Sequence, residues 1–81
     1  MNWLYNFKAY CQESGIHLLP DDMRYIETML KKLCPVDRRD VAHKYYGVWI
    51  RSLAEAPYPA IAQNYARNRA NTYLRDACDR K

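Results

Sequence analysis

The sequence predicts an all-α protein, a compact bundle of four helices. Its apolar residues recur three and four positions apart, which is the spacing of one helix face. No segment alternates apolar and polar residues as a half-buried strand would. Two glycines and four prolines interrupt the 81 residues, and all except Gly47 lie where helices are expected to begin or end. A chain of this length supports one hydrophobic core, so a single domain over residues 1–81 is expected.

The first two helices are expected over residues 3–14 and 20–34. Gly15 suits a left-handed stop after the first helix, from which Ile16 folds back onto its apolar face. Pro20 suits the first turn of the second helix. The first helix is the candidate for a peripheral position in the bundle. The predicted apolar faces are Trp3, Leu4, Phe7, Tyr10 and Cys11 on the first helix, and Met23, Ile26, Leu30, Leu33 and Cys34 on the second.

The third helix is expected over residues 37–55, after Pro35 ends the second. Asp37 is the expected N-cap, with Asp40 three residues later in a carboxylate variant of the capping box. Apolar residues cover more than half of this helix, which indicates the central helix of the domain or a helix that contacts a partner. Gly47 is expected to permit the close approach of another helix or an aromatic ring.

The fourth helix is expected over residues 59–78 and has two contrasting sides. One side is small and apolar, which predicts close packing on a neighbouring helix or on a second copy of the chain in a homodimer. It consists of Ala62, Ala66, Ala70, Tyr73, Leu74 and Ala77. The other side, which is expected to face solvent, consists of Asn64, Asn68, Asn71 and Arg75, flanked by Arg67. Arg69 lies at the border, where its guanidinium can stack on Tyr65 or Tyr73.

The polar side of the fourth helix is a candidate nucleic-acid interface. Arginine neutralises phosphate and reads guanine, and asparagine reads adenine through paired hydrogen bonds. Residues 57–81 carry five basic and two acidic residues, a net charge of +3 out of +4 for the whole chain. However, Asp76 and Asp79 dilute this basic field, and no helix-turn-helix pattern is present. Four basic residues elsewhere in the chain are expected to add phosphate contacts to this candidate interface: Lys31, Lys32, Arg38 and Arg39.

A protein partner, self-association included, is the preferred interpretation over nucleic acid. Tyrosine, tryptophan and arginine dominate the energetics of protein interfaces. The chain has eight tyrosines and two tryptophans, more than one small core hides completely. Tyr46 and Ile50 form the candidate partner patch on the third helix. Tyr5, Tyr25 and Tyr58 also lie outside the predicted buried faces.

The sequence carries no motif for catalysis, a cofactor or a metal. It has no phosphate-binding glycine loop, no HExxH and no nucleophile elbow, so a non-enzymatic protein without a cofactor is expected. Cys11, Cys34 and Cys78 form no CxxC pair, and small buried thiols on helix faces are expected. No apolar run reaches the roughly 20 residues of a membrane span, and a cytoplasmic location is expected.

Three segments carry a resemblance of general style. They are MNWLYNFKAYCQESG, CPVDRRDVAHKYYGVW and NYARNRANTYLRDAC, in a short, helical, tyrosine-rich chain that contains cysteine. Such a chain resembles small accessory proteins of temperate, lambda-like phages and prophages of enteric bacteria. The resemblance implies binding to a host protein of DNA or RNA metabolism in the bacterial cytoplasm. It includes no diagnostic motif, so no functional residue is carried over from it.

Overall fold

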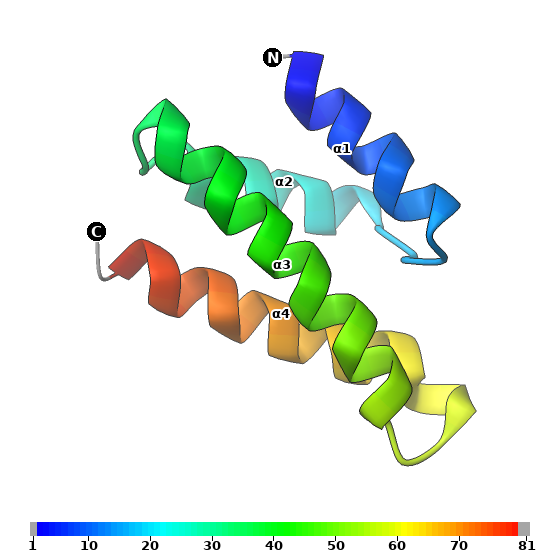
Figure 1. The fold of residues 1–81 in the computed structure, drawn as a ribbon. Coiled ribbons are helices and arrows are strands. Elements are labelled where there is room, and N and C mark those ends of the chain that lie inside the picture. The colour runs from blue at the N-terminus through cyan, green and yellow to red at the C-terminus, as the bar shows by residue number, and fades with distance from the viewer. Residues whose placement is uncertain (1, 80–81) are drawn as a thin grey trace.

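The computed structural model describes the backbone of residues 2–79 and the side chains of residues 6–79. Within these residues there are helices and no strands, which confirms the predicted all-α class with four helices. Figure 1 shows their order and arrangement. The elements are α1 (Asn2–Glu13), α2 (Pro20–Leu30), α3 (Pro35–Glu55), a short 3-10 turn η1 (Pro59–Ile61) and α4 (Ala62–Asp79).

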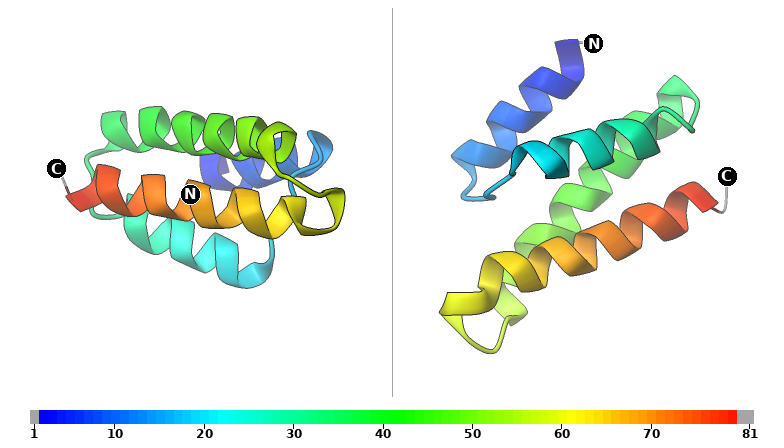
Figure 2. Two further views of the ribbon diagram at one scale, coloured as in Figure 1. Left: turned by 90° about the horizontal axis from the view of Figure 1, so that it is seen from below. Right: turned by 180° about the vertical axis from the view of Figure 1, so that it is seen from behind.

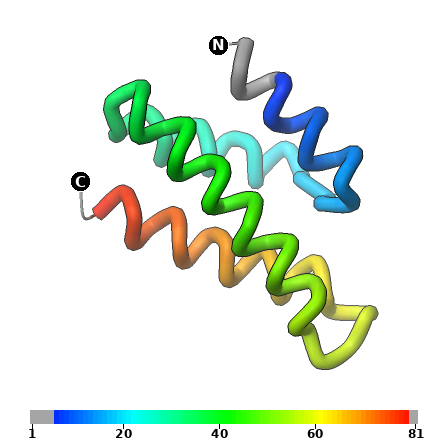
Figure 3. The backbone as a smooth tube through the Cα atoms, viewed as in Figure 1, coloured from blue at the N-terminus to red at the C-terminus, as the bar shows by residue number. Residues whose placement is uncertain are grey.

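The helices lie in two layers, with α1 and α3 in one and α2 and α4 in the other (Figure 2). The extents of 37 × 26 × 19 Å agree with this flattened shape. The most extensive packing joins α3 to α4, which follow one another as an antiparallel pair (Figure 3). The helix α1 has the fewest contacts with the rest of the bundle, as its predicted peripheral position requires.

The end of α1 follows the predicted left-handed stop. Gly15 has a φ of 88°, a value that glycine adopts without a steric penalty. The amide of Gly15 donates to the carbonyl of Gln12 at 3.2 Å, and the amide of Ile16 donates to that of Cys11 at 3.0 Å. This pair of bonds is the Schellman motif. Ile16 is fully buried, so it makes the apolar contact that the motif calls for.

The junction of α2 and α3 differs from the prediction. The helix α2 ends at Leu30 instead of residue 34, and α3 begins at Pro35 instead of residue 37. A residue before proline is pushed out of the helical region, and Cys34 is accordingly extended at φ −69° and ψ 157°. The chain must therefore turn before Cys34. Pro35 then starts α3 at its first position, where its missing amide costs nothing.

Two side chains at this junction consequently have other roles than predicted. Asp37 is not the N-cap of α3 but lies in its first turn, where the thiol of Cys34 donates to its Oδ2 at 3.2 Å. Asp40 takes no part in a capping box and pairs with Lys44 at 3.1 Å. Cys34 is exposed and not part of a buried face, whereas Cys11 and Cys78 are buried as predicted.

The core lies between the two layers and contains Ile26 and Leu30 of α2, Tyr45 and Trp49 of α3, and the packing side of α4. Ala66, Ala70 and Leu74 are fully buried, which confirms the predicted packing side of α4. Because these alanines pack within one chain, they are not open to a second copy. Gly47 differs from its prediction, since a Cβ atom there would meet no atom within 4 Å. Of the predicted face of α1, Phe7 and Cys11 are buried and Tyr10 is half exposed; the side chains of Trp3 and Leu4, like that of Tyr5, lie outside the described residues.

The buried thiol of Cys11 predicts a loss of stability in alkali. Burial raises its pKa from 9.0 to about 12, and burial also raises the pKa of the Tyr45 hydroxyl. Above pH 9 the unfolded chain therefore releases a proton that the folded chain keeps, which favours unfolding. The free energy of unfolding should be unaffected below this pH and should fall by about 1.4 kcal/mol per pH unit above it. Urea titrations at a series of alkaline pH values measure this slope.

Two single variants separate the thiol from other alkaline effects. Cys11→Ala removes one of the two thiols whose pKa burial raises, Cys78 being the other, and should reduce the slope just above pH 9, before the tyrosines of the unfolded chain begin to ionise. Cys34→Ala changes an exposed thiol and should leave the slope as it is. Equal slopes in Cys11→Ala and the parent chain would contradict the assignment.

Candidate interaction surface

The predicted polar side of α4 does not form one surface, because Arg67 is directed into the molecule. Its Nε donates to Oδ2 of Asp22 at 2.9 Å, and its Nη2 donates to the carbonyl of His17 at 2.9 Å. Its guanidinium also lies 5.2 Å from the ring centroid of Trp49. The Arg67 and Asp22 side chains are 16% and 7% exposed. The prediction that Arg67 faces solvent is wrong, and its charge stabilises the contact between α4 and the start of α2.

Gln63 completes this polar cluster. Its Oε1 accepts from Trp49 Nε1 at 3.1 Å and from the amide of His17 at 3.2 Å, and its Nε2 donates to the carbonyl of Gly15 at 2.9 Å. One side chain thereby joins the α1–α2 loop, α3 and α4. The cluster is a structural element that holds the loops at one end of the bundle in place.

The other predicted contacts of α4 divide between the interior and the solvent. Asn71 is half buried and accepts from the hydroxyl of Tyr45 at 3.1 Å, and Asn64 accepts from Nη1 of Arg67 at 2.6 Å. Asn64, Asn68 and Arg75 are exposed. The exposed charges of α4 among the described residues are Arg69, Arg75, Asp76 and Asp79, which sum to zero. The exposed face of α4 is therefore polar but carries no net positive charge.

The basic residues expected to support a nucleic-acid contact are partly engaged inside the protein. The Nε of Arg38 donates to the carbonyls of Leu30 and Leu33 at 3.0 and 2.9 Å, so this side chain caps the C-terminal end of α2. Lys31 pairs with Glu27 at 3.1 Å, and Lys32 is exposed in the turn before α3. Arg39 lines a pocket of about 340 Å³ between α1 and α3. Of the four cations, Arg38 and Lys31 are thus engaged within the protein, and Lys32 and Arg39 are exposed.

The predicted partner patch of Tyr46 and Ile50 is half buried. The hydroxyl of Tyr46 donates to Ser14 Oγ at 2.9 Å, and its ring lies 4.9 Å from the ring of Tyr10. These contacts attach α1 to α3. Tyr46 thus stabilises the fold and offers a partner little free surface.

A different group of apolar side chains is exposed at the connection of α3 and α4. All five residues from Pro57 to Ile61 are exposed, and Tyr58 and Ile61 are 66% and 43% exposed. We call residues 57–61 the apolar tip. It forms the end of the α3–α4 pair in Figure 1. Leu19, 53% exposed, lies in the α1–α2 loop, which Gln63 holds near the start of α4.

The two prolines of the apolar tip restrict its backbone. Ala56 and Tyr58 each precede a proline and are extended, with ψ values of 137° and 139°. Pro59 then opens η1, in which the amide of Ile61 donates to the carbonyl of Tyr58 at 3.2 Å. A segment restricted in this way loses little conformational entropy when it binds. The tip therefore presents two large apolar side chains on an ordered backbone.

Tyr58 was predicted to lie outside the buried faces, and the structure confirms this. The grouping of residues 57–61 as one exposed surface was not predicted. The sequence signal is that APYPAIA is a run of seven apolar residues with two prolines, too short and irregular for a buried helix. The pairing of Asp22 with Arg67 was not predicted from the sequence either. Arg67 precedes Leu74 by seven residues, which places both on the same helix face.

Comparison of the chain with protein-family models, with curated proteins and with solved structures gave no match. Among residues 2–79, no helix is long and apolar enough to cross a membrane. No three His, Cys, Asp or Glu side chains gather as metal ligands in the same part of the chain.

Proposed function

We propose that this chain is a small non-enzymatic interaction module that binds a protein partner through its apolar tip. The observation that supports the proposal is the exposure of Tyr58 and Ile61 on an ordered connection. The core is built without them, so the fold gives no reason for their presence. Tyrosine is enriched among the residues that dominate binding energy, and exposed apolar surface is typical of interaction sites.

The distribution of charge supports a protein partner over direct nucleic-acid binding. A nucleic-acid interface needs basic side chains that are free to meet phosphates along one surface. Arg67 and Arg38 are engaged inside the protein, and the exposed charges of α4 cancel. Direct binding through the last helix stays the alternative, with Asn64, Asn68 and Arg75 as its exposed contacts.

The class of partner follows from the resemblance to accessory proteins of temperate phages and prophages. Such a protein would act by stoichiometric binding to a host protein that handles DNA or RNA. A binding tip on a small helical scaffold suits this role, because it needs neither a substrate pocket nor a cofactor.

The double variant Tyr58→Ser with Ile61→Ser tests the tip. The tagged full chain and the variant are used to capture partners from an enteric bacterial lysate treated with nuclease. The parent chain is expected to retain a protein partner after nuclease treatment. The double variant is expected to retain at most about one tenth of that amount of partner. Both substitutions are at exposed positions, so circular dichroism should show an unchanged helical content.

Val36→Ser is the matched control. Val36 is 80% exposed and lies at the start of α3, at the other end of that helix from the apolar tip. This variant should capture as much partner as the parent chain. Equal capture by the double variant and the parent chain would show that the tip is not the binding site. Loss of the captured protein on nuclease treatment would support nucleic-acid binding instead.

A further inference from the structure

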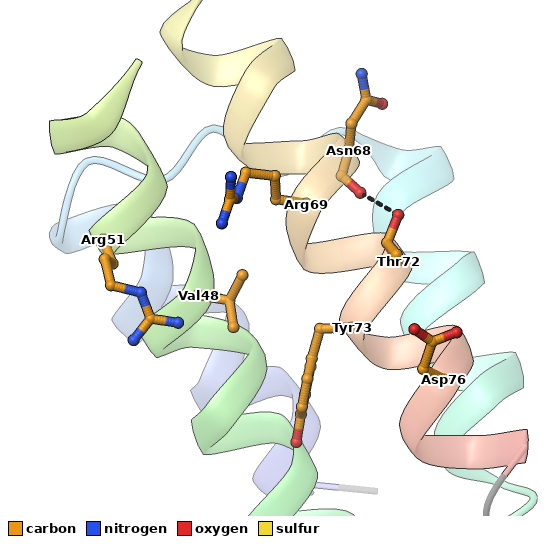
Figure 4. A pocket seen from close by; sticks show the side chains of 7 residues that line it. All are labelled: Val48, Arg51, Asn68, Arg69, Thr72, Tyr73 and Asp76. Carbon is orange, nitrogen blue, oxygen red and sulfur yellow. Dashed lines mark hydrogen bonds between the residues drawn. The ribbon is translucent and has the colours of Figure 1, made fainter.

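A groove between α3 and α4 lies outside the apolar tip and the polar cluster. One part has a volume of about 420 Å³ and is lined by residues of both helices, which Figure 4 shows. An adjoining part of about 360 Å³ shares three lining residues with it. We call the two parts together the α3–α4 groove. The lining residues of the first part are Val48, Arg51, Asn68, Arg69, Thr72, Tyr73 and Asp76, and the second part adds Lys44 and Gly47.

Cations occupy both sides of the α3–α4 groove. Arg51 extends from α3 and Arg69 from α4, and both are exposed (Figure 4). Nη1 of Arg69 donates to the hydroxyl of Tyr65 at 3.1 Å, a neutral acceptor that holds the guanidinium without compensating its charge. Lys44 is paired with Asp40, but both side chains are more than 60% exposed, so solvent weakens the pair. The groove thus attracts negative charge.

The floor of the α3–α4 groove is apolar. Val48 and Tyr73 are half buried there, and Gly47 adds no side chain. A Cβ atom at Gly47 would meet nothing within 4 Å, so the space above this position is open. The groove can therefore take one apolar side chain between its cationic sides.

We propose that the α3–α4 groove binds an acidic peptide segment of a protein partner. Its carboxylates pair with Arg51 and Arg69, and an apolar side chain between them packs on the floor at Gly47 and Val48. Arginine binds carboxylate through two parallel hydrogen bonds, which makes such pairs strong and directional. This site shares no residue with the apolar tip, so peptide binding in the groove can be tested independently of partner binding at the tip.

Asp76 favours a peptide over a nucleic acid in the groove. A nucleic-acid strand carries a phosphate at every residue, so one of its charges would meet the carboxylate of Asp76. A peptide can place its carboxylates opposite Arg51 and Arg69 and leave a neutral or basic residue opposite Asp76. The mixed charge of the groove also gives a bound peptide a preferred direction.

Selection from a phage-displayed library of random peptides of about 12 residues tests this proposal on the full chain. The enriched peptides are expected to carry Asp or Glu on both sides of an apolar residue. A fluorescein-labelled copy of the most enriched peptide is then titrated by fluorescence anisotropy. The variant Arg51→Glu with Arg69→Glu should weaken its binding by about tenfold or more.

Three further variants make the result specific. Arg51→Gln with Arg69→Gln removes the charges and keeps hydrogen-bond donors, and it should also weaken binding. Arg39→Glu reverses an exposed charge of α3 that lies at the pocket between α1 and α3, outside the lining of the groove, and should leave binding within about twofold. Tyr58→Ser with Ile61→Ser should leave peptide binding unchanged, since the tip is a separate site.

Two outcomes would overturn the proposal. One is enrichment of peptides without acidic residues, or of acidic peptides whose binding survives both double substitutions in the groove. The other is tighter binding of an oligothymidylate of similar length that the same substitutions abolish, which would make the groove a nucleic-acid site. Neither outcome bears on partner capture through the apolar tip.

Discussion

A Trp49→Ala variant is expected to lose about 3–5 kcal/mol of its free energy of unfolding. Trp49 is fully buried, and its ring lies 5.9 Å from the ring of Tyr45. Its Nε1 donates to Gln63, and Arg67 lies over its face. The substitution thus removes the largest side chain of the core, one of the two hydrogen bonds to Gln63 Oε1 and the ring beneath Arg67. A domain of this size has about 4–12 kcal/mol in total.

The variant should consequently be unfolded at much lower urea concentrations than the parent, or unfolded in buffer. Urea titration followed by far-ultraviolet circular dichroism measures the change. Val48→Ala, one residue earlier on the half-buried floor of the α3–α4 groove, is the control and should cost about 1 kcal/mol. Similar losses in both variants would show that Trp49 is not at the centre of the core.

An Asp22→Ala variant is expected to lose about 3 kcal/mol, because removing one partner of a buried ion pair leaves the other charge without compensation. Oδ2 of Asp22 accepts from Arg67 Nε at 2.9 Å and from the amide of Leu19 at 2.8 Å. The substitution therefore also removes an acceptor at the start of α2. Arg67 keeps 16% of its side chain in contact with solvent, which places the expected loss at the lower end for buried pairs.

Asp21→Ala is a closely matched control for this prediction. Asp21 is the preceding residue on α2 and pairs with Arg24, with both side chains more than 70% exposed. Exposed pairs contribute little, so this variant should lose less than about 1 kcal/mol. The two variants are compared by urea titration at neutral pH. If their losses were equal, the buried pair would have no special part in stability.

The sequence was sufficient for the fold class and for the elements whose signals are local. The left-handed Gly15, the apolar stripe of α4 and the peripheral α1 follow from spacing and from single-residue preferences. The α2–α3 junction was predicted wrongly because Pro35 fits two interpretations. A proline both ends the helix before it and starts the helix after it. Residues 31–34 form a connection, held by the Arg38 side chain, where the second helix was expected to continue.

The candidate site could be predicted less well, because it depends on which polar groups find partners across the bundle. Arg67 and Asp22 are 45 positions apart, and no local pattern pairs them. Tyr46 similarly meets Ser14 through the packing of α1 on α3. Conversely, Arg51 and Arg69 become neighbours on one groove only when α3 and α4 pair. Exposure of Tyr58 was predictable, because it lies between two helix-breaking prolines.

The ends of α1 and α4 that are nearest the chain termini lie away from the apolar tip (Figures 1 and 2). A larger body joined to either terminus would therefore leave the tip unobstructed and pointing outward. The bundle measures up to 37 Å, so such a body would be separated from residues 57–61 by most of that length. A terminal affinity tag or a surface attachment is accordingly compatible with partner capture through Tyr58 and Ile61.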